Sequence, residues 1–380
     1  MATATHRFPF PRVLISAVAL TSLITGCAGD APLALSAAVP TASTTEECGR
    51  AGAARALCGF TNPEDMVPLP GNEALLIGEY GQSADDHSGA LVVFDLATES
   101  RTVVYRGGKA AASAEAGWGA PECTTAPDAR FNSHGLDLVR RDDDRLALLV
   151  VQHGSREAVE FFEVHRSAAG WQVEWRGCVP SPPDASLNEV AALSDGSFFT
   201  TKMASLTGAA DLSGGFPDAS TGRAFRWSAD TGFIAIGGTE GIMPNGIVAA
   251  PDGRTIFMNA SGENSIRKVD VERGVEVARA AVTSPDNVTW SPDGRLLVAS
   301  LRGMDDPDLF EACLHAEGRP CAIPFAIVAI DPESMTSLGD VYESDGQPMG
   351  AGTVGLQVGD ELFAGSFKGD RILRIQLAED

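Results

Sequence analysis

The chain has 380 residues, with 28 Lys and Arg against 51 Asp and Glu and a formal net charge of −23. Such an acidic protein lacks the basic patches that neutralise nucleic-acid phosphates, so nucleic acid is excluded as a partner. The chain is longer than most single domains, but closed β architectures can hold this many residues around one core.

The first 26 residues predict an export signal. Arg7 and Arg12 precede an apolar stretch, residues 13–24, that is too short to span a bilayer comfortably. Residues 23–27 read Leu-Ile-Thr-Gly-Cys, which resembles a bacterial lipobox. By that resemblance Cys27 becomes the acylated first residue of the mature protein, and Ala28 favours the periplasmic side of the outer membrane. A lipid at Cys27 would hold the protein at the membrane of the cell envelope. An ordinary secretory signal cleaved nearby is the alternative.

The chain after the signal divides into a tether and a folded domain. Residues 27–57 are rich in Ala, Ser and Thr, a composition that predicts a flexible, lipid-anchored tether. Residues 58–380 then form the folded domain. Apart from Cys27 the chain holds an even number of cysteines, which in an exported protein predicts disulfides. The sequence leaves other pairings open, but the candidate pairs are Cys48–Cys58, Cys123–Cys178 and Cys313–Cys321.

Short β-rich runs dominate this domain, and each is entered through a turn of Asp, Gly or Asn residues. Six such runs occur, at residues 70–77, 142–149, 194–199, 251–257, 292–298 and 359–364. Each turn followed by apolar and β-branched residues predicts a strand. Self-similar all-β units of about 40–50 residues are typical of a propeller. We therefore expect an all-β fold, a six-bladed β-propeller with a central metal site.

A second run upstream of each turn predicts the innermost strand of each blade. These runs begin near residues 62, 133, 186, 244, 285 and 350. Inner strands start at one face of a propeller and line its channel, so their first polar residues should gather at one mouth. Asn and Asp are unfavourable in strands, which makes a functional role the better explanation than turn capping. The residues expected there are Glu64, Asp65, His134, Asn188, Glu189, Asn245, Asp286 and Asn287.

These side chains predict a metal-assisted hydrolase. Carboxylate and amide oxygens without thiolates or metal-spaced histidines suit Ca²⁺ best. A cation there could polarise an ester or lactone carbonyl. Residues 133–139 and 146–152 read as a hairpin whose outer ends carry His134 and His153, and a hairpin brings those ends together. His134 could then take a proton from water while His153 orients it. The alternative is that each is an ordinary loop histidine.

Motifs of other hydrolases are missing from the sequence. It contains no Gly-x-Ser-x-Gly nucleophile elbow and no His-Glu-x-x-His zinc motif. Gly350-Ala-Gly-Thr-Val-Gly355 matches a dinucleotide pattern by letter. It lacks the βαβ context that this pattern requires, so we interpret these glycines as part of a blade turn.

The stretch from Ser133-His-Gly-Leu through Val151-Gln-His-Gly154 to Leu187-Asn-Glu-Val190 resembles the paraoxonase/arylesterase family of six-bladed calcium propellers. The likeness implies lactonase and arylesterase activity and a dyad of His134 and His153. It also implies two calcium ions. The catalytic ion would be held by Glu64, Asn188, Asn245, Asp286 and Asn287, and the structural ion by Asp65, Glu189 and the main-chain carbonyl of Leu136.

Three features depart from that family. Glu189 stands where the family usually has Asp, and the family's disulfide between the terminal strands has no C-terminal partner because the last cysteine is Cys321. The segment Gly303 to Pro324 looks like an added loop, and we expect it to shape substrate choice. A nearby relative is the gluconolactonase/regucalcin group, with one divalent metal and sugar lactones as substrates. The other alternative is a non-catalytic, membrane-anchored binding propeller.

Overall fold

The computed structural model describes residues 42–81, 89–108, 113–208, 219–316 and 320–378, all within one compact unit, Val39–Asp380. The first sheet contains β1 (Ala42–Thr44), β4 (Pro63–Pro68), β5 (Ala74–Glu79), β6 (Ala90–Asp95) and β7 (Ser100–Tyr105). The second sheet contains β8 (Ser133–Arg140), β9 (Leu146–Gln152), β10 (Ala158–Ser167) and β11 (Gly170–Pro180). The third sheet contains β12 (Ser186–Ala192), β13 (Phe198–Ala204), β14 (Arg223–Ser228) and β15 (Gly232–Ala235). The fourth sheet contains β16 (Pro244–Ala249), β17 (Thr255–Ala260), β18 (Ser265–Asp270) and β19 (Val275–Ala281).

The last two sheets complete the ring. The fifth sheet contains β20 (Pro285–Trp290), β21 (Leu296–Leu301), β22 (Phe325–Asp331) and β23 (Thr336–Ser344). The sixth sheet contains β24 (Gly352–Val358), β25 (Glu361–Ser366), β26 (Arg371–Gln376), β3 (Ala54–Cys58) and β2 (Glu46–Ala51). The described helices are short: η1 (Leu206–Gly208), η3 (Ser261–Glu263) and α1 (Pro307–Leu314). No helix of the described residues is long and apolar enough to cross a membrane.

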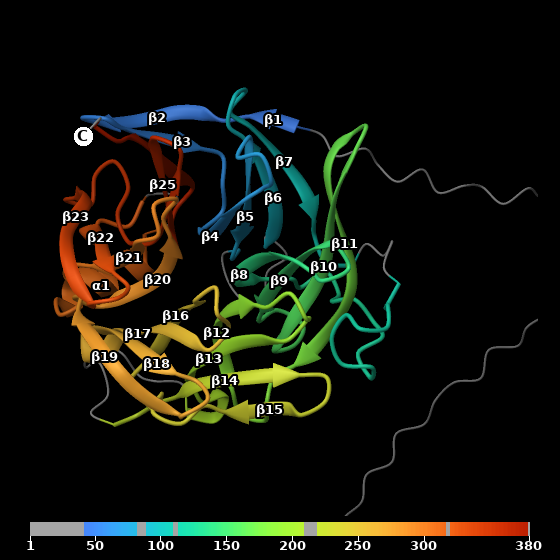
Figure 1. The fold of residues 1–380 in the computed structure, drawn as a ribbon. Coiled ribbons are helices and arrows are strands. Elements are labelled where there is room, and N and C mark those ends of the chain that lie inside the picture. Colours follow the sequence, from blue (N-terminus) through green and yellow to red (C-terminus); the bar gives the residue numbers. More distant parts are fainter. Residues whose placement is uncertain (1–41, 82–88, 109–112, 209–218, 317–319, 379–380) are drawn as a thin grey trace, which may run out of the picture. The chain divides into compact units, whose positions relative to one another are not determined.

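The described residues thus form six antiparallel sheets arranged around a centre, which confirms the predicted six-bladed propeller (Figure 1). The inner strands β4, β8, β12, β16, β20 and β24 each contact the next, and β24 contacts β4. The predicted turns open the second strand of each blade. Gly253 and Gly294, with φ of 65° and 85°, lie just before β17 and β21. Such positive φ values suit glycine, because it has no Cβ to clash with the backbone.

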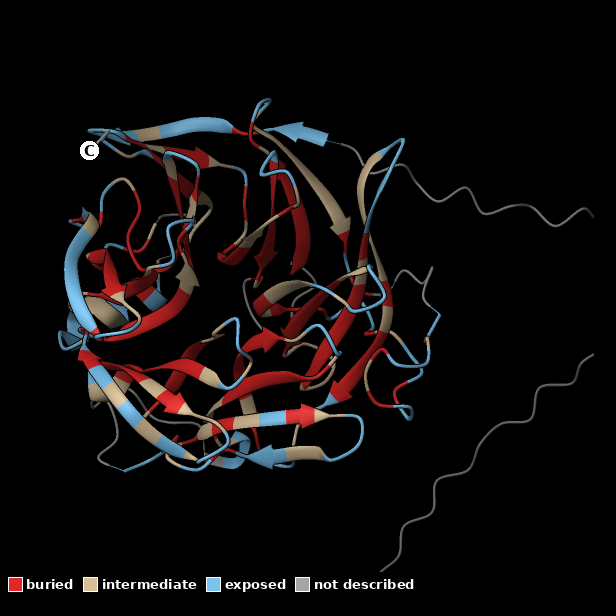
Figure 2. Ribbon diagram, in the orientation of Figure 1, coloured by how far each residue is buried: buried red, intermediate tan, exposed pale blue. Residues whose placement is uncertain are grey.

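The core lies between neighbouring sheets. The second strand of a blade, such as β5, is buried along its whole length, whereas the outer strands β19 and β23 are largely exposed (Figure 2). Each apolar cluster takes side chains from adjacent blades; Leu76, Leu91, Leu148 and Phe162, for example, pack together between the first two. Every sheet therefore buries both faces, and each blade depends on its neighbours for stability.

Hydrogen bonds from side chains to the backbone also tie each blade to the inner strand of the next blade. A side chain near the channel reaches a main-chain group of the following blade at every junction between described blades. The six links are Asp65 Oδ2 to Leu136 N, Asp137 Oδ2 to Ala192 N, Thr201 Oγ1 to Asn245 O, Asn259 Nδ2 to Asp286 O, Thr289 Oγ1 to Gly355 O and Thr353 Oγ1 to Glu64 O. These buried bonds fix the inner strands relative to one another.

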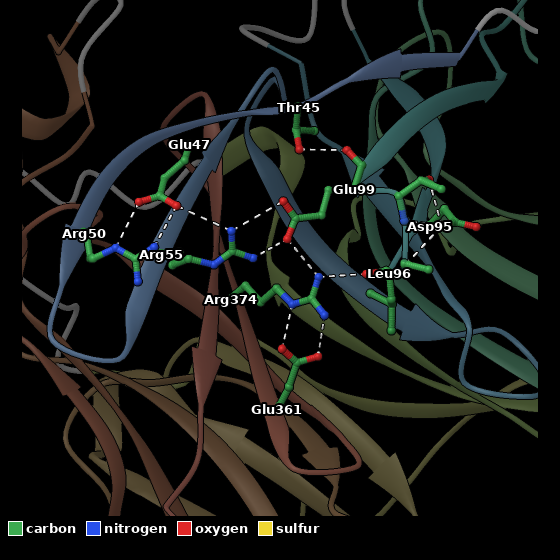
Figure 3. A network of polar contacts seen from close by, with 11 residues as sticks. Thr45, Glu47, Arg50, Arg55, Asp95, Leu96, Glu99, Glu361 and Arg374 are labelled. Atoms are coloured by element: carbon green, nitrogen blue, oxygen red, sulfur yellow. Dashed lines mark hydrogen bonds and ion pairs between the residues drawn. The ribbon is translucent and has the colours of Figure 1, made fainter.

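The N-terminal strands close the ring. β3 pairs between β2 and β26 in the last blade, and β1 pairs with β7 of the first blade. Ion pairs join the same elements: Arg374 forms two 2.7 Å bonds to Glu361 and one of 2.9 Å to Glu99, and Arg55 contacts Glu99 from the other side (Figure 3). The predicted domain start at residue 58 is therefore too late, because residues from Ala42 onward already belong to the sheets. The predicted signal, residues 1–26, and the first part of the predicted tether lie outside the described residues.

All three candidate disulfides are confirmed. Cys48–Cys58 joins β2 to β3, and Cys313–Cys321 braces the segment that contains α1. Cys123–Cys178 attaches the loop before β8 to the end of β11. Local pairing was readable from spacing, whereas the last disulfide, with a sequence separation of 55, forms because the fold brings the loop before β8 against β11.

Candidate functional site

Each inner strand is irregular near its first residues. The pairing register shifts between Pro63 and Asp65 in β4, and an equivalent shift occurs at the start of every other described inner strand. A bulge of this kind bends a strand and re-aims the side chains that it leaves unpaired. The residues skipped by the ladders are Glu64, His134, Gly135, Asn188, Glu189, Asn245, Gly246, Asp286, Asn287 and Thr353. Nearly all the polar residues predicted for the channel mouth therefore occupy bulges.

One cavity of about 260 Å³ lies over these bulges. Its polar floor is built from different blades and brings together Glu64, His134, Asn188, Asn245 and Asp286. Four of these are among the five expected ligands of the catalytic calcium, and the other is the first histidine of the expected dyad. The structure thus brings these five residues together around one cavity.

Three oxygens on this floor have no hydrogen-bond partner. They are Glu64 Oε2, Asn188 Oδ1 and Asn245 Oδ1, each buried. The amide nitrogens are used elsewhere: Asn188 Nδ2 contacts Met203 Sδ at 3.5 Å and Asn245 Nδ2 donates to Ser261 Oγ at 3.2 Å. Because buried polar atoms are normally satisfied, this set fits a hard cation that takes carboxylate and amide oxygens.

Burial also disfavours the ionised form of the carboxyl groups on the floor. Burial and the nearby charges of Asp65 and Asp286 raise the pKa of Glu64 well above its ordinary value. Burial raises the pKa of Asp286 to about 7, even though a hydrogen bond from Asn245 opposes that shift. Carboxyl groups with such raised pKa values would become fully ionised again beside a bound cation.

Two details qualify the expected ligand set. Asn287 donates its Nδ2 to Glu64 Oε1 at 3.0 Å, so its amide faces the site with the nitrogen; a half-turn of the amide would present the oxygen. In the part of the chain that the structure describes, no three His, Cys, Asp or Glu side chains form a metal site by themselves. A cation here would depend on the amide oxygens of Asn188 and Asn245.

The residues predicted for a second ion, Asp65 and Glu189, directly follow Glu64 and Asn188 of the first group in the chain. Asp65 and Glu189 are both buried and close enough to influence each other's charge, and burial raises the pKa of both carboxyls, that of Asp65 to about 7. Gly135 permits this approach, because a Cβ there would lie 2.3 Å from Glu189 Oε1. Leu136 meets Asp65 through its N–H, at 2.9 Å from Oδ2. Its carbonyl, the predicted ligand, has no contact of this kind to the pair.

The two histidines form a direct pair, as the hairpin predicted. His134 Nδ1 lies 2.8 Å from His153 Nε2, and His153 Nδ1 lies 2.7 Å from Glu157 Oε1. The carboxylate of Glu157 can only accept, so His153 donates to it and accepts from His134. That chain of bonds leaves His134 Nε2 without a proton, 3.8 Å from Glu64 Oε1. Burial and the neighbouring His153 lower the pKa of His134, which keeps this nitrogen available as a base.

Sequence reasoning missed two members of the site. Glu157 follows His153 by four residues in a turn before β10, and nothing in its spacing marks it as a histidine partner. Tyr80 follows β5 and packs its ring 5.2 Å from that of His134 and 6.0 Å from that of His153. A run of apolar strand residues ending in Glu-Tyr gave no signal of this contact, because it is made across two blades.

Comparisons with known proteins agree with the fold. A family model described as the SMP-30/gluconolactonase/LRE-like region matches residues 80–303. The fold is similar to that of a gluconolactonase from Xanthomonas campestris, with 15% identity, 88% of this chain and 95% of that chain covered, and a TM-score of 0.52. It is also similar to a luciferin-regenerating enzyme, with 12% identity, coverage of 89% and 95%, and a TM-score of 0.51. No curated protein sequence matches the chain.

Proposed function

Because the chain belongs to the SMP-30/gluconolactonase/LRE-like family, we propose that it is a divalent-cation-dependent hydrolase of lactones or carboxylic esters. The observation that carries the proposal is the convergence of unpartnered oxygens from Glu64, Asn188 and Asn245 on the cavity that His134 lines. We propose Ca²⁺ as the cation, since all the donors are carboxylate or amide oxygens. Asp286 and Asn287 would complete its ligands.

The chemistry divides between the cation and the histidine pair. A bound Ca²⁺ would act as a Lewis acid toward the scissile carbonyl and stabilise the developing oxyanion. His134 removes a proton from the attacking water at Nε2, the nitrogen that its bond to His153 leaves free. His153 and Glu157 hold that tautomer and stabilise the positive charge that His134 acquires. Tyr80 packs on both rings and limits their rotation.

We propose Asp65 and Glu189 as ligands of a second, structural Ca²⁺. The support is their burial as a close carboxyl pair, an arrangement that a cation stabilises. Isothermal titration of the metal-free protein with Ca²⁺ should give two ions per chain, and Glu189→Gln should reduce this to one. A stoichiometry of one in the unaltered protein would contradict the second site.

The activity is tested with a substrate panel. Purified protein is assayed with Ca²⁺ and with chelator on aliphatic γ- and δ-lactones, an acyl-homoserine lactone, gluconolactone and phenyl acetate. We expect turnover that the chelator abolishes. Turnover of gluconolactone alone would favour the sugar lactones that the family name includes. No turnover of any member, with Ca²⁺ bound, would contradict the proposal and favour a binding propeller.

A histidine substitution separates catalysis from metal binding. His134→Gln removes the base, and general-base catalysis contributes about 10²–10⁴-fold, so kcat should fall by at least about 100-fold. Ca²⁺ should still raise the melting temperature, because His134 is not a proposed ligand. His165→Gln, an exposed position on β10, is the matched control and should behave like the unaltered protein. Unchanged activity in His134→Gln would place the base elsewhere.

We also propose that Cys27 is lipidated and anchors the protein to the bacterial outer membrane, facing the periplasm. The lipobox-like sequence ending at Cys27 supports this. Mass spectrometry of protein from membrane fractions should find a diacylated or triacylated Cys27 at the N-terminus. Cys27→Ser should move the protein to the soluble fraction, and an unmodified Cys27 would contradict the anchor.

A further inference from the structure

Above its polar floor, the cavity is walled almost entirely by apolar side chains. One side of this wall comes from the connection between β21 and β22, which we call the β21–β22 insert and describe over residues 302–316 and 320–324. Its lining residues are Met304 and Phe310, next to Leu301 at the end of β21. The remaining apolar wall is made of Tyr80, Met203, Met243 and Phe367.

Of the four residues with a hydroxyl group that line the cavity, Tyr80, Ser261, Ser284 and Thr353, two have theirs engaged by the protein itself. Ser261 Oγ donates to the carbonyl of Pro285, and Thr353 Oγ1 donates to that of Glu64 at 2.7 Å. Among the described residues that line the cavity there is no Lys, Arg or Gln. A site that recognises a polyhydroxylated ring needs a hydrogen-bonding group for each hydroxyl, and the wall offers very few.

The β21–β22 insert is held in place at both ends. At its base Arg302 N donates to the carbonyl of Pro324 at 2.7 Å. α1 begins at a cap in which Asp306 accepts from the next turn, and Cys313 near its end is buried and bonded to Cys321. Leu309 and Phe310 pack against the apolar cluster between the fifth and sixth blades. The insert therefore presents Phe310 to the cavity from a braced helix.

We propose that the β21–β22 insert is the specificity element of this site and binds the apolar substituent of the substrate. The inference rests on the proposed hydrolase function and names its substrate class: lactones or esters that carry an alkyl chain or an aromatic ring, in preference to sugar lactones. The reacting carbonyl lies over the polar floor, and the substituent lies between Phe310, Met304 and Phe367.

The test measures kcat/KM on γ-lactones whose alkyl substituent grows from none to six carbons, with gluconolactone alongside. Each methylene transferred from water to an apolar wall should raise kcat/KM by about four-fold until the wall is covered. Phe310→Ala and Met304→Ala should each lower the ratio of long-chain to unsubstituted kcat/KM by at least about ten-fold. The two positions are partly exposed, so a misfolded Phe310→Ala still leaves Met304→Ala as a test.

Leu314→Ala is the matched control. Leu314 is on the same helix but exposed, at 48%, and its substitution should leave that ratio unchanged. Turnover that does not depend on chain length, a preference for gluconolactone, or an unchanged ratio in both wall variants would overturn the specificity role and leave the hydrolase function intact. If the unaltered protein turns over no lactone with Ca²⁺ bound, the hydrolase function fails, and the specificity role fails with it.

Discussion

At the scale of single residues, the site depends on side chains that would be costly elsewhere in a β-sheet. Glu64, Asn188 and Asn245 are buried at strand starts with oxygens that have no partner. A buried unpaired oxygen or carboxylate destabilises a fold unless something compensates it. The propeller places these oxygens around one point, so a single cation can satisfy all of them at once. In the metal-free protein, the same oxygens that are proposed to bind the cation therefore lower the stability of the fold.

Asp286→Asn tests this effect directly. In the metal-free protein at pH 8, above the folded pKa of about 7, the substitution removes a buried charge and should raise the melting temperature by roughly 2–4 °C. It should also weaken Ca²⁺ binding and remove activity. Differential scanning calorimetry with chelator and with Ca²⁺ measures both effects. Asp230→Asn, on the exposed turn before β15, is the control; a loss of metal-free stability in Asp286→Asn would contradict the assignment.

At the scale of elements, the bulge at the start of each inner strand creates the site and the disulfides hold the loops around it. Cys123–Cys178 attaches the loop before β8, the strand of His134, to the last strand of the same blade. This loop enters β8 immediately before the bulge. The disulfide therefore restrains the segment that positions the first histidine.

Removing that disulfide should cost more stability than removing a local one. The loop-entropy model gives about 4 kcal/mol for a sequence separation of 55 and about 3 kcal/mol for a separation of 10. Urea unfolding of the Cys123→Ser/Cys178→Ser double variant should show the larger loss, and Cys48→Ser/Cys58→Ser the smaller one. The reverse order would indicate that strand pairing of β2 and β3, not loop entropy, dominates.

At the scale of the whole propeller, stability depends on closing the ring between the first and last blades. Each inner strand contacts the inner strands of the two neighbouring blades. Closing the ring therefore affects all the inner strands through these contacts. The ion pairs of Figure 3 lie at this junction, where Arg374 contacts both Glu361 and Glu99 and stacks 5.7 Å from the ring of Phe363. Because Arg374 is mostly buried, at 16% exposure, this network is less screened than a surface pair.

Arg374→Met should therefore destabilise the protein by about 2–4 kcal/mol, since it leaves Glu361 without its partner, while Glu99 keeps Arg55. The comparison is Arg254→Met, which breaks a pair with Glu272 whose side chains are 65% and 59% exposed. Such a surface pair contributes about 0–1 kcal/mol. Denaturant unfolding of both variants gives the two losses, and equal losses would show that the closure does not depend on this network.

The metal-free protein should become less stable as pH rises. The folded-state pKa values of Asp65 and Asp286 are raised from 3.8 to about 7, so between these values the folded protein binds more protons than the unfolded chain. The raised pKa values of Glu64 and Glu189 act in the same direction, whereas the lowered pKa of His134 opposes the fall below pH 6.5. Stability therefore falls overall from about pH 4 through pH 7. Melting temperatures in chelator should follow this course, and added Ca²⁺ should stabilise more at pH 8 than at pH 5. A metal-free stability that rises over this range would contradict the carboxylate cluster.

The sequence by itself determined the number of blades, the turn that opens each second strand and the residues that begin each inner strand. Those features are local: a turn signal followed by β-branched residues, as at Pro251-Asp-Gly253 before β17, needs no distant partner. The His134–His153 contact was also readable, because one hairpin places both. The start of the folded unit was not, since β3 is a strand only because β26 lies beside it.

Tertiary structure alone decided how these residues act. Bulges in the register aim the candidate ligands at one point, and packing across blades brings Tyr80 against both histidine rings. The bond from His153 to Glu157 sets the tautomer of His153 and thereby leaves Nε2 of His134 without a proton. The apolar wall of the β21–β22 insert likewise exists only where α1 packs between two blades. Local sequence specifies strands and turns, whereas distances between side chains from different blades follow from closing the ring.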